Sequence, residues 1–96
     1  MRNIQKNVKA FCDNNHLVAP APIWLMDAIS ELSEVSKECS RDNEKLIIEL
    51  GDALFSLIGL ANSLDVDLQA ALAAALMQYS EQNERENEIA REAVEE

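Results

Sequence analysis

Two carboxylates, Glu49 and Asp52, stand inside the most apolar stretch of the chain, residues 46–64, and they are its only charges. Moving a carboxylate out of water costs several kcal/mol unless a cation or hydrogen-bond donors compensate it. The pair therefore indicates either a metal site or a buried salt bridge with a Lys or Arg of a neighbouring helix.

A second acidic pair, Glu31 and Glu34, lies on an amphipathic segment at residues 23–39. The polar residues 40–44 separate this segment from the apolar one, which predicts an antiparallel helical hairpin. Each pair lies about nine residues from the centre of the break, so both should be roughly 13 Å from the turn at 1.5 Å per residue. The sequence thus predicts four carboxylates at one height of a hairpin.

A cluster made only of carboxylates favours hard cations such as Mg²⁺ or Mn²⁺. Magnesium usually shares its coordination shell with substrate phosphates, which indicates phosphoryl or nucleotidyl chemistry. Di-iron bundle proteins need Glu-x-x-His motifs. The single histidine, His16, is not part of one, which makes that alternative weak.

The run ELSE at residues 31–34, followed by ELGDALFSLIGLANSL from residue 49, resembles the MazG-type nucleotide pyrophosphohydrolases of the all-α NTP pyrophosphatase superfamily. The resemblance covers roughly residues 20–76. It implies an all-α hairpin with flanking helices, assembling into a four-helix-bundle-like oligomer, either a homodimer or a tetramer made of two dimers. It also implies Mg²⁺-dependent cleavage of a (d)NTP into (d)NMP and pyrophosphate, with removal of non-canonical nucleotides as a role.

Carried over residue by residue, the resemblance makes Glu31, Glu34, Glu49 and Asp52 the metal ligands. Glu34 or Glu31 would also act as general base toward the attacking water. Mn²⁺ could replace Mg²⁺. A rival interpretation from another class is a non-catalytic helical assembly module, in which the acids bind a structural metal or a basic partner.

The chain departs from the family on its last helix, where many members carry Lys or Arg for the substrate phosphates. Here no basic residue lies between Asp67 and Arg85. Phosphate binding is therefore assigned to other cations, with Trp24 as a stacking or packing residue and Asn62 as a base-recognising or turn-binding residue. The basic candidates are Lys37, Arg41 and Lys45, with Lys6 and Lys9 as further possibilities.

Composition limits the remaining classes of function. The chain has 96 residues, enough for one small domain, and a net charge of −10, which argues against nucleic acid and anionic membranes as partners. Cys12 and Cys39 are too few for a disulfide framework and fit reduced thiols in the cytoplasm. The two acids in the apolar stretch argue against a membrane span.

Four helices are expected: residues 4–14, 23–39, 43–63, and 68 onward. The first should carry its apolar face at Ile4, Val8, Phe11 and Cys12, and a connector containing two prolines should follow at residues 17–22. Asp67 is the expected N-cap of the last helix. We divide the chain into a helical domain, 1–80, and an acidic tail, 81–96, that is either a helical extension or disordered.

The third helix is apolar around almost its whole circumference. We therefore expect it to be buried nearly all round, which one partner helix and two short helices cannot achieve. The pattern predicts that hairpins pair into a larger bundle.

Overall fold

The computed structural model describes residues 1–38 and 43–95, and all regular structure in these ranges is helical, as predicted. The third helix has the predicted bounds and the fourth begins at the predicted residue, whereas the first two each begin two residues earlier than predicted. The four helices are α1 (Arg2–Asn14), α2 (Ala21–Glu38), α3 (Asn43–Ser63) and α4 (Leu68–Glu95).

The start of α2 shows why the prolines did not delay the helix. Pro22 is the second residue of α2, within its first turn, where the missing N–H of proline costs no helical hydrogen bond. The carbonyl oxygen of Pro20 accepts the N–H groups of Ile23 at 3.0 Å and Trp24 at 3.4 Å. The predicted connector is therefore two residues shorter than expected.

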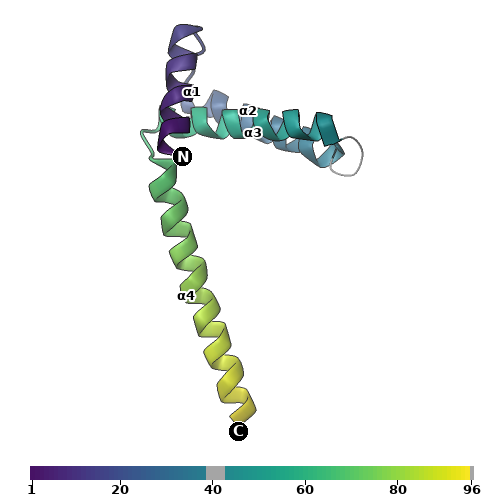
Figure 1. Ribbon diagram of the computed structural model, residues 1–96, viewed down its shortest axis with the longest axis vertical. Helices are drawn as coiled ribbons and strands as arrows, with labels where there is room; N and C mark the ends of the chain where they lie inside the picture. Colours follow the sequence, from purple (N-terminus) through teal and green to yellow (C-terminus); the bar gives the residue numbers. More distant parts are fainter. Residues whose placement is uncertain (39–42, 96) are drawn as a thin grey trace.

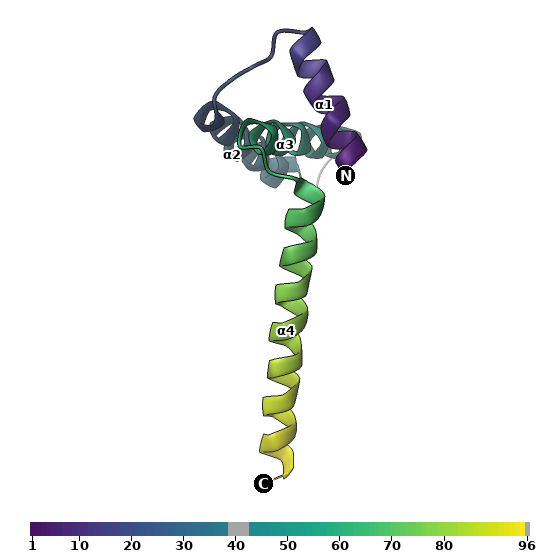
Figure 2. The same ribbon diagram turned by 90° about the vertical axis from the view of Figure 1, so that its left-hand side faces the viewer.

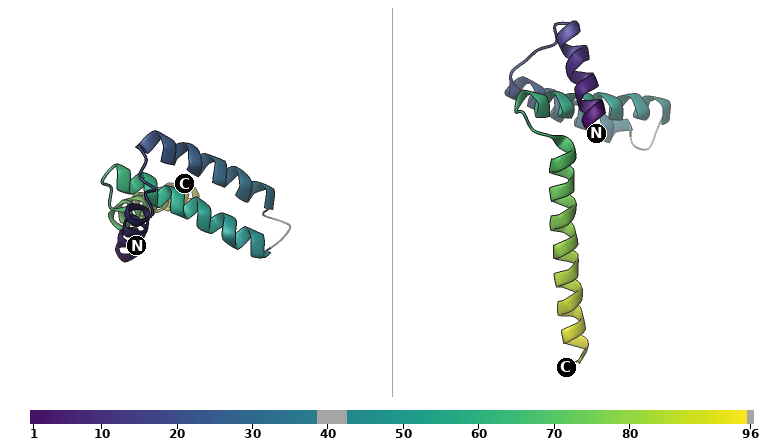
Figure 3. Two further views of the ribbon diagram at one scale, coloured as in Figure 1. Left: turned by 90° about the horizontal axis from the view of Figure 1, so that it is seen from above. Right: turned by 60° about the vertical axis from the view of Figure 1, so that its left-hand side comes forward.

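Helices α2 and α3 form the predicted antiparallel hairpin, and α1 crosses α3 near the end away from residues 39–42 (Figures 1 and 3). The core lies at that same end. Ile58 is 1% exposed, and Ala28 and Ala53 are also buried. The ring of Phe55 makes edge contacts with Trp24 at 5.8 Å and with Phe11 at 6.1 Å between centroids, so it joins all three helices.

Helix α1 is rotated from the predicted orientation, so that only part of its predicted face, Cys12 and in part Val8, is covered. Gln5 and Cys12 are buried, whereas Ile4 and Phe11 remain about half exposed. The Gln5 amide makes three inward hydrogen bonds: its Nε2 donates to Asn62 Oδ1 and to the Val66 carbonyl, and its Oε1 accepts from Leu68 N–H. Satisfying these polar groups rotates the helix away from its purely apolar face.

Helix α4 begins at the predicted N-cap and then leaves the rest of the chain. Asp67 Oδ1 accepts the N–H groups of Gln69 at 2.9 Å and Ala70 at 3.3 Å. Figures 1 and 2 show α4 projecting as one continuous helix through the acidic tail. The radius of gyration is 18.2 Å, against about 13 Å for a compact 100-residue domain.

The third helix is less covered than its apolar sequence predicts. Ile47, Ile48 and Leu50 are all more than half exposed, because only α2 packs along this half of α3. By length and composition the segment Glu44–Ser63 could cross a membrane, with a mean hydropathy of 1.4. Core helices of soluble proteins meet the same criteria, so the absence of a span stays a prediction.

Candidate metal centre

Three of the four predicted acids meet between α2 and α3. One carboxylate oxygen from each of Glu31, Glu49 and Asp52 lies within 4.8 Å of the other two. Glu31 comes from α2, and the other two lie one turn apart on α3, as the matched distances from the turn predict. We call these three residues the acid cluster.

The acid cluster lies at the surface of the hairpin. Glu31 and Glu49 are half-buried and Asp52 is exposed, so the expectation that both acids of α3 are enclosed is wrong for a single chain. The hairpin is only two helices thick, which leaves the acid stripe of α3 open on one side. The ion pairs of the described residues include Arg2–Asp67, Lys9–Asp13 and Lys37–Glu34, and none of these three involves the acid cluster. The salt-bridge alternative stays open.

Within the acid cluster, the pKa of Glu31 is raised. Partial removal of its carboxyl from water raises its pKa above the ordinary value of 4.5, and the negative charges of Asp52 and Glu49 raise that pKa further. A hydrogen bond with Glu49 and the charge of Glu34 act in the same direction. The cluster therefore favours uptake of a positive charge, either a proton or a metal ion.

Glu34 does not join the other three oxygens. Its Oε1 accepts a hydrogen bond from Lys37 Nζ at 3.2 Å, an ion pair across one turn of α2. Glu34 nevertheless lies close enough to contribute to the raised pKa of Glu31. Its assignment as a ligand or a general base stays a prediction.

The predicted phosphate-binding cations differ in their position. Lys37 is engaged with Glu34 on the exposed side of α2. Lys45 is exposed on α3, one turn before Glu49. Arg41 lies outside the described residues. Lys6 and Lys9 belong to α1, which crosses the opposite end of the hairpin (Figure 1).

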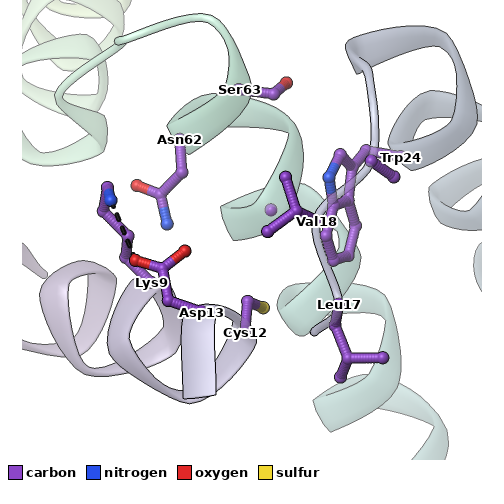
Figure 4. Close-up of a pocket in the computed structure, with 10 residues that line it drawn as sticks. Lys9, Cys12, Asp13, Leu17, Val18, Trp24, Asn62 and Ser63 are labelled. Carbon is purple, nitrogen blue, oxygen red and sulfur yellow. Dashed lines mark hydrogen bonds and ion pairs between the residues drawn. The ribbon is translucent and has the colours of Figure 1, made fainter. Parts of the chain in front are cut away.

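Trp24 and Asn62 both line a pocket of about 210 Å³ between α1, the connector and the end of α3 (Figure 4). Trp24 is 8% exposed, and its six-membered ring packs directly against Gly59. The contact is so close that a side chain at Gly59 would overlap the ring. Asn62 forms two hydrogen bonds with Gln5. Its Oδ1 accepts from the side-chain Nε2 of Gln5, and its Nδ2 donates to the backbone carbonyl of Gln5 at 3.3 Å.

This pocket is separate from the acid cluster. Gly59 follows Asp52 by seven residues, which is about 10 Å along the helix. The residues that line the pocket include Lys9 and Asp13, which form an ion pair at 3.1 Å, and Cys12. Burial, and then the charge of Asp13, raises the pKa of the Cys12 thiol above its ordinary value, so it stays protonated.

The sequence interpretation missed Gln5, which ties α1 to the start of α4. The available signal was its spacing of seven residues from Cys12, which places both on one side of a helix. A polar residue at an inward position indicates a hydrogen-bonding role, but its partners, at residues 62, 66 and 68, are distant in sequence.

No family model matches the chain, and no curated protein or solved structure matches it either. The resemblance to MazG-type enzymes therefore rests on its own motif residues. The chemistry has to be argued from the acid cluster.

Proposed function

We propose that the chain is a Mg²⁺-dependent nucleoside triphosphate pyrophosphohydrolase that cleaves a (d)NTP into (d)NMP and pyrophosphate. The observation that supports this most is the approach of three carboxylates from two helices to within 4.8 Å. The negative charges of Asp52 and Glu49 raise the pKa of Glu31, and this mutual repulsion favours binding of a cation.

The residues of the acid cluster fit a hard divalent ion. All three donors are carboxylate oxygens, and neither sulfur nor imidazole lies among them, which favours Mg²⁺ or Mn²⁺ over zinc. Such an ion neutralises phosphate charge and makes bound water more acidic. Glu34, one turn from Glu31, would complete the ligand set once released from Lys37.

The protein groups have distinct tasks in this proposal. The acid cluster holds the triphosphate through the cation, and Glu31 or Glu34 accepts a proton from the water that attacks the α-phosphorus. Lys37 and Lys45 flank the cluster on α2 and α3 and would contact phosphate oxygens. Trp24 and Asn62, at the neighbouring pocket, would contact the nucleoside.

Assembly into a dimer or a tetramer of two dimers is part of the proposal. Ile47 and Leu50, about 60° apart on α3, leave an exposed apolar face on the half of the helix that carries the acid cluster. Pairing two hairpins through this face would make a four-helix bundle. It would also bring basic residues of a second chain closer to the hairpin.

The deciding experiment measures pyrophosphate release from a panel of standard and modified nucleotides with Mg²⁺, with Mn²⁺ and with EDTA. We expect metal-dependent release of one pyrophosphate per monophosphate. Asp52→Asn should lower release by about a hundredfold or more. Asp27→Asn, on the exposed part of α2 before Glu31, should retain it. No release from any nucleotide at high protein concentration would favour the rival function, a non-catalytic assembly module.

A further inference from the structure

An apolar groove lies at the corner where α3 leads into α4. Its volume is about 500 Å³, and its accessible lining is almost wholly apolar. Contiguous apolar surfaces of this kind mark interaction sites when they are exposed on a soluble chain. The groove, which we call the corner groove, includes Met1, Leu54, Leu57 and Leu64, together with Leu68 and Leu72 of α4.

The corner groove continues as one face of α4. At about 100° per residue, the leucines and the tyrosine of its first half fall within about 80° of one another, and Met77 lies on the opposite side. The same sector recurs in the second half with two alanines and a valine. We call this sector the apolar face of α4; its members are Leu68, Leu72, Ala75, Leu76, Tyr79, Ala90, Ala93 and Val94.

Most charges of α4 lie on the opposite side, and Glu86 is an exception that falls within the apolar sector. Four glutamates of its second half lie within about 80° of one another and roughly 180° from the apolar face. This segregation is typical of a helix that packs on one side and meets water on the other. The glutamates are Glu81, Glu84, Glu88 and Glu92.

The apolar face of α4 cannot be covered by its own chain in this arrangement. Arg2 Nε donates to Asp67 Oδ2 at 2.7 Å, and Gln5 binds Val66 and Leu68, which together set the direction of the helix. As a result α1 and α4 start side by side and run in opposite directions along nearly the same line (Figures 1 and 2). Within residues 1–38 and 43–95, no helix is placed to cover the length of this face.

A second α4, running antiparallel, matches this geometry along its whole length. Its first half would lie in the corner groove, and its second half would continue along α1. Residues 80–94 span about 22 Å and α1 about 20 Å, so the lengths agree. On α1 the groove between Ile4, Val8 and Phe11 would receive Ala90 and Val94 of the second copy.

We propose that α4 forms a two-fold symmetric homodimer interface, in which each copy places the apolar face of its α4 in the corner groove of the other. Because α4 is about 42 Å long and about 10 Å wide, each copy would bury roughly 400 to 800 Å², within reach of a stable interface. Because the two copies are related by a two-fold axis, the corner groove of each copy contacts α4 of the other. This inference does not depend on hydrolysis.

The first test compares two substitutions on the same helix by sedimentation velocity at micromolar concentration. Leu72 lies on the apolar face and is 53% exposed in the protomer, and Met77 lies on the opposite side and is 66% exposed. Leu72→Glu should halve the wild-type mass, whereas Met77→Glu should leave it unchanged. A monomeric wild type, or equal masses for the two variants, would overturn the proposal.

Cysteine cross-linking tests the antiparallel orientation without relying on a disruptive variant. In a Cys39→Ser background, Ala75→Cys lies near the proposed two-fold axis and should form an intermolecular disulfide on oxidation. Gln82→Cys, on the same side but away from the axis, should not. Cross-linking at both positions would indicate parallel helices and contradict the model, as would its absence at Ala75.

A membrane is the competing occupant of this face. Flotation with phosphatidylcholine vesicles distinguishes the two, because a dimer that hides the apolar face of α4 should stay with the soluble fraction. A monomer that floats with vesicles, and loses this property in Leu72→Glu, would assign the face to lipid and refute the homodimer.

Discussion

The two halves of α3 differ sharply in what covers them. The half from Ala53 to Ser63 lies under α1 and the start of α2, with Phe55 in contact with two other aromatic rings. The half from Asn43 to Asp52 meets α2 alone and leaves Ile47 and Ile48 exposed. Burial, and with it the stability gained from packing, is concentrated at one end of the hairpin, and the acid cluster lies toward the other.

This separation has a physical advantage for a metal centre. Carboxylates that converge in a well-packed core would pay the full cost of desolvation and mutual repulsion. Toward the thinly covered end, water reduces both costs until a cation binds. The comparison predicts that substitutions at the acid cluster change function with little loss of stability, and that substitutions at the packed end do the reverse.

The largest effect is expected at the acid cluster itself. Glu49→Gln and Asp52→Asn should each lower pyrophosphate release by about a hundredfold or more, because a metal ligand is lost while the shape is kept. Apo stability should stay level or rise, since a repelling charge is removed. The increase in melting temperature given by Mg²⁺ should shrink with affinity.

Melting curves with and without Mg²⁺ decide between this role and a structural one, with Asp27→Asn as the matched charge control. If the acids instead held a buried Lys or Arg, the amides would destabilise the protein by roughly 3 to 5 kcal/mol, with or without metal. Such a result would reject the metal centre.

The packed end is tested by its glycine. A Cβ at Gly59 would overlap the ring of Trp24, which is itself buried against Phe55. Gly59→Ala should therefore lower the free energy of unfolding by about 3 kcal/mol, the upper part of the range for overpacking. Urea denaturation measures this change, and binding of Mg²⁺ at the acid cluster of the folded fraction should persist.

The matched control is the other glycine of the same helix. A Cβ at Gly51 would meet nothing within 4 Å, so Gly51→Ala should raise the free energy of unfolding by up to about 1 kcal/mol through helix propensity alone. Equal effects at the two glycines would show that the two halves of α3 do not differ in packing.

The sequence was sufficient where a pattern is local. The bounds of α3 and the N-cap at Asp67 follow from hydrophobic periodicity and capping chemistry, which involve neighbours along the chain. The convergence of Glu31 with Glu49 and Asp52 followed from simple distances along two helices. These predictions needed no knowledge of tertiary packing.

Other features depend on contacts between distant residues. The inward position of Gln5 is set by hydrogen bonds to residues more than fifty positions away. The exposure of Ile47 results from the small number of helices that pack against this half of α3. Periodicity identified an apolar helix correctly but could not say whether its own chain covers it. The sequence did not decide whether the tail, residues 81–96, is helical or disordered, because the tail has few large apolar residues.

A smaller effect is expected at the junction between α1 and α4. Gln5→Ala would leave the Val66 carbonyl and the Leu68 N–H without their partner, so the free energy of unfolding should fall by about 1 to 2 kcal/mol. Gln82→Ala, on the exposed part of α4, should change it by less than about 0.5 kcal/mol. Similar values for both glutamines, measured by urea denaturation, would show that the junction contributes little.

The smallest effect concerns the pH dependence of stability without metal. Because the folded-state pKa of Glu31 is raised above 4.5, its contribution to stability is fully present below the unfolded pKa and is lost as the pH rises through the folded pKa. Glu31→Gln should remove this loss, so the stability profile of the variant should be flatter above pH 4.5. Asp27→Asn is the control, because Asp27 is not among the causes of this raised pKa.

Salt separates the two causes of that shift. Repulsion from Asp52 and Glu49 is screened at about 1 M salt, where the Debye length is near 3 Å, whereas desolvation, the larger cause, is not. The difference between wild type and Glu31→Gln should therefore decrease in high salt without vanishing. A wild type that gains stability relative to Glu31→Gln as the pH rises would mean that a positive group pairs with this carboxylate. The thinly covered end of the hairpin would then hold an ion pair in place of a vacant charge cluster.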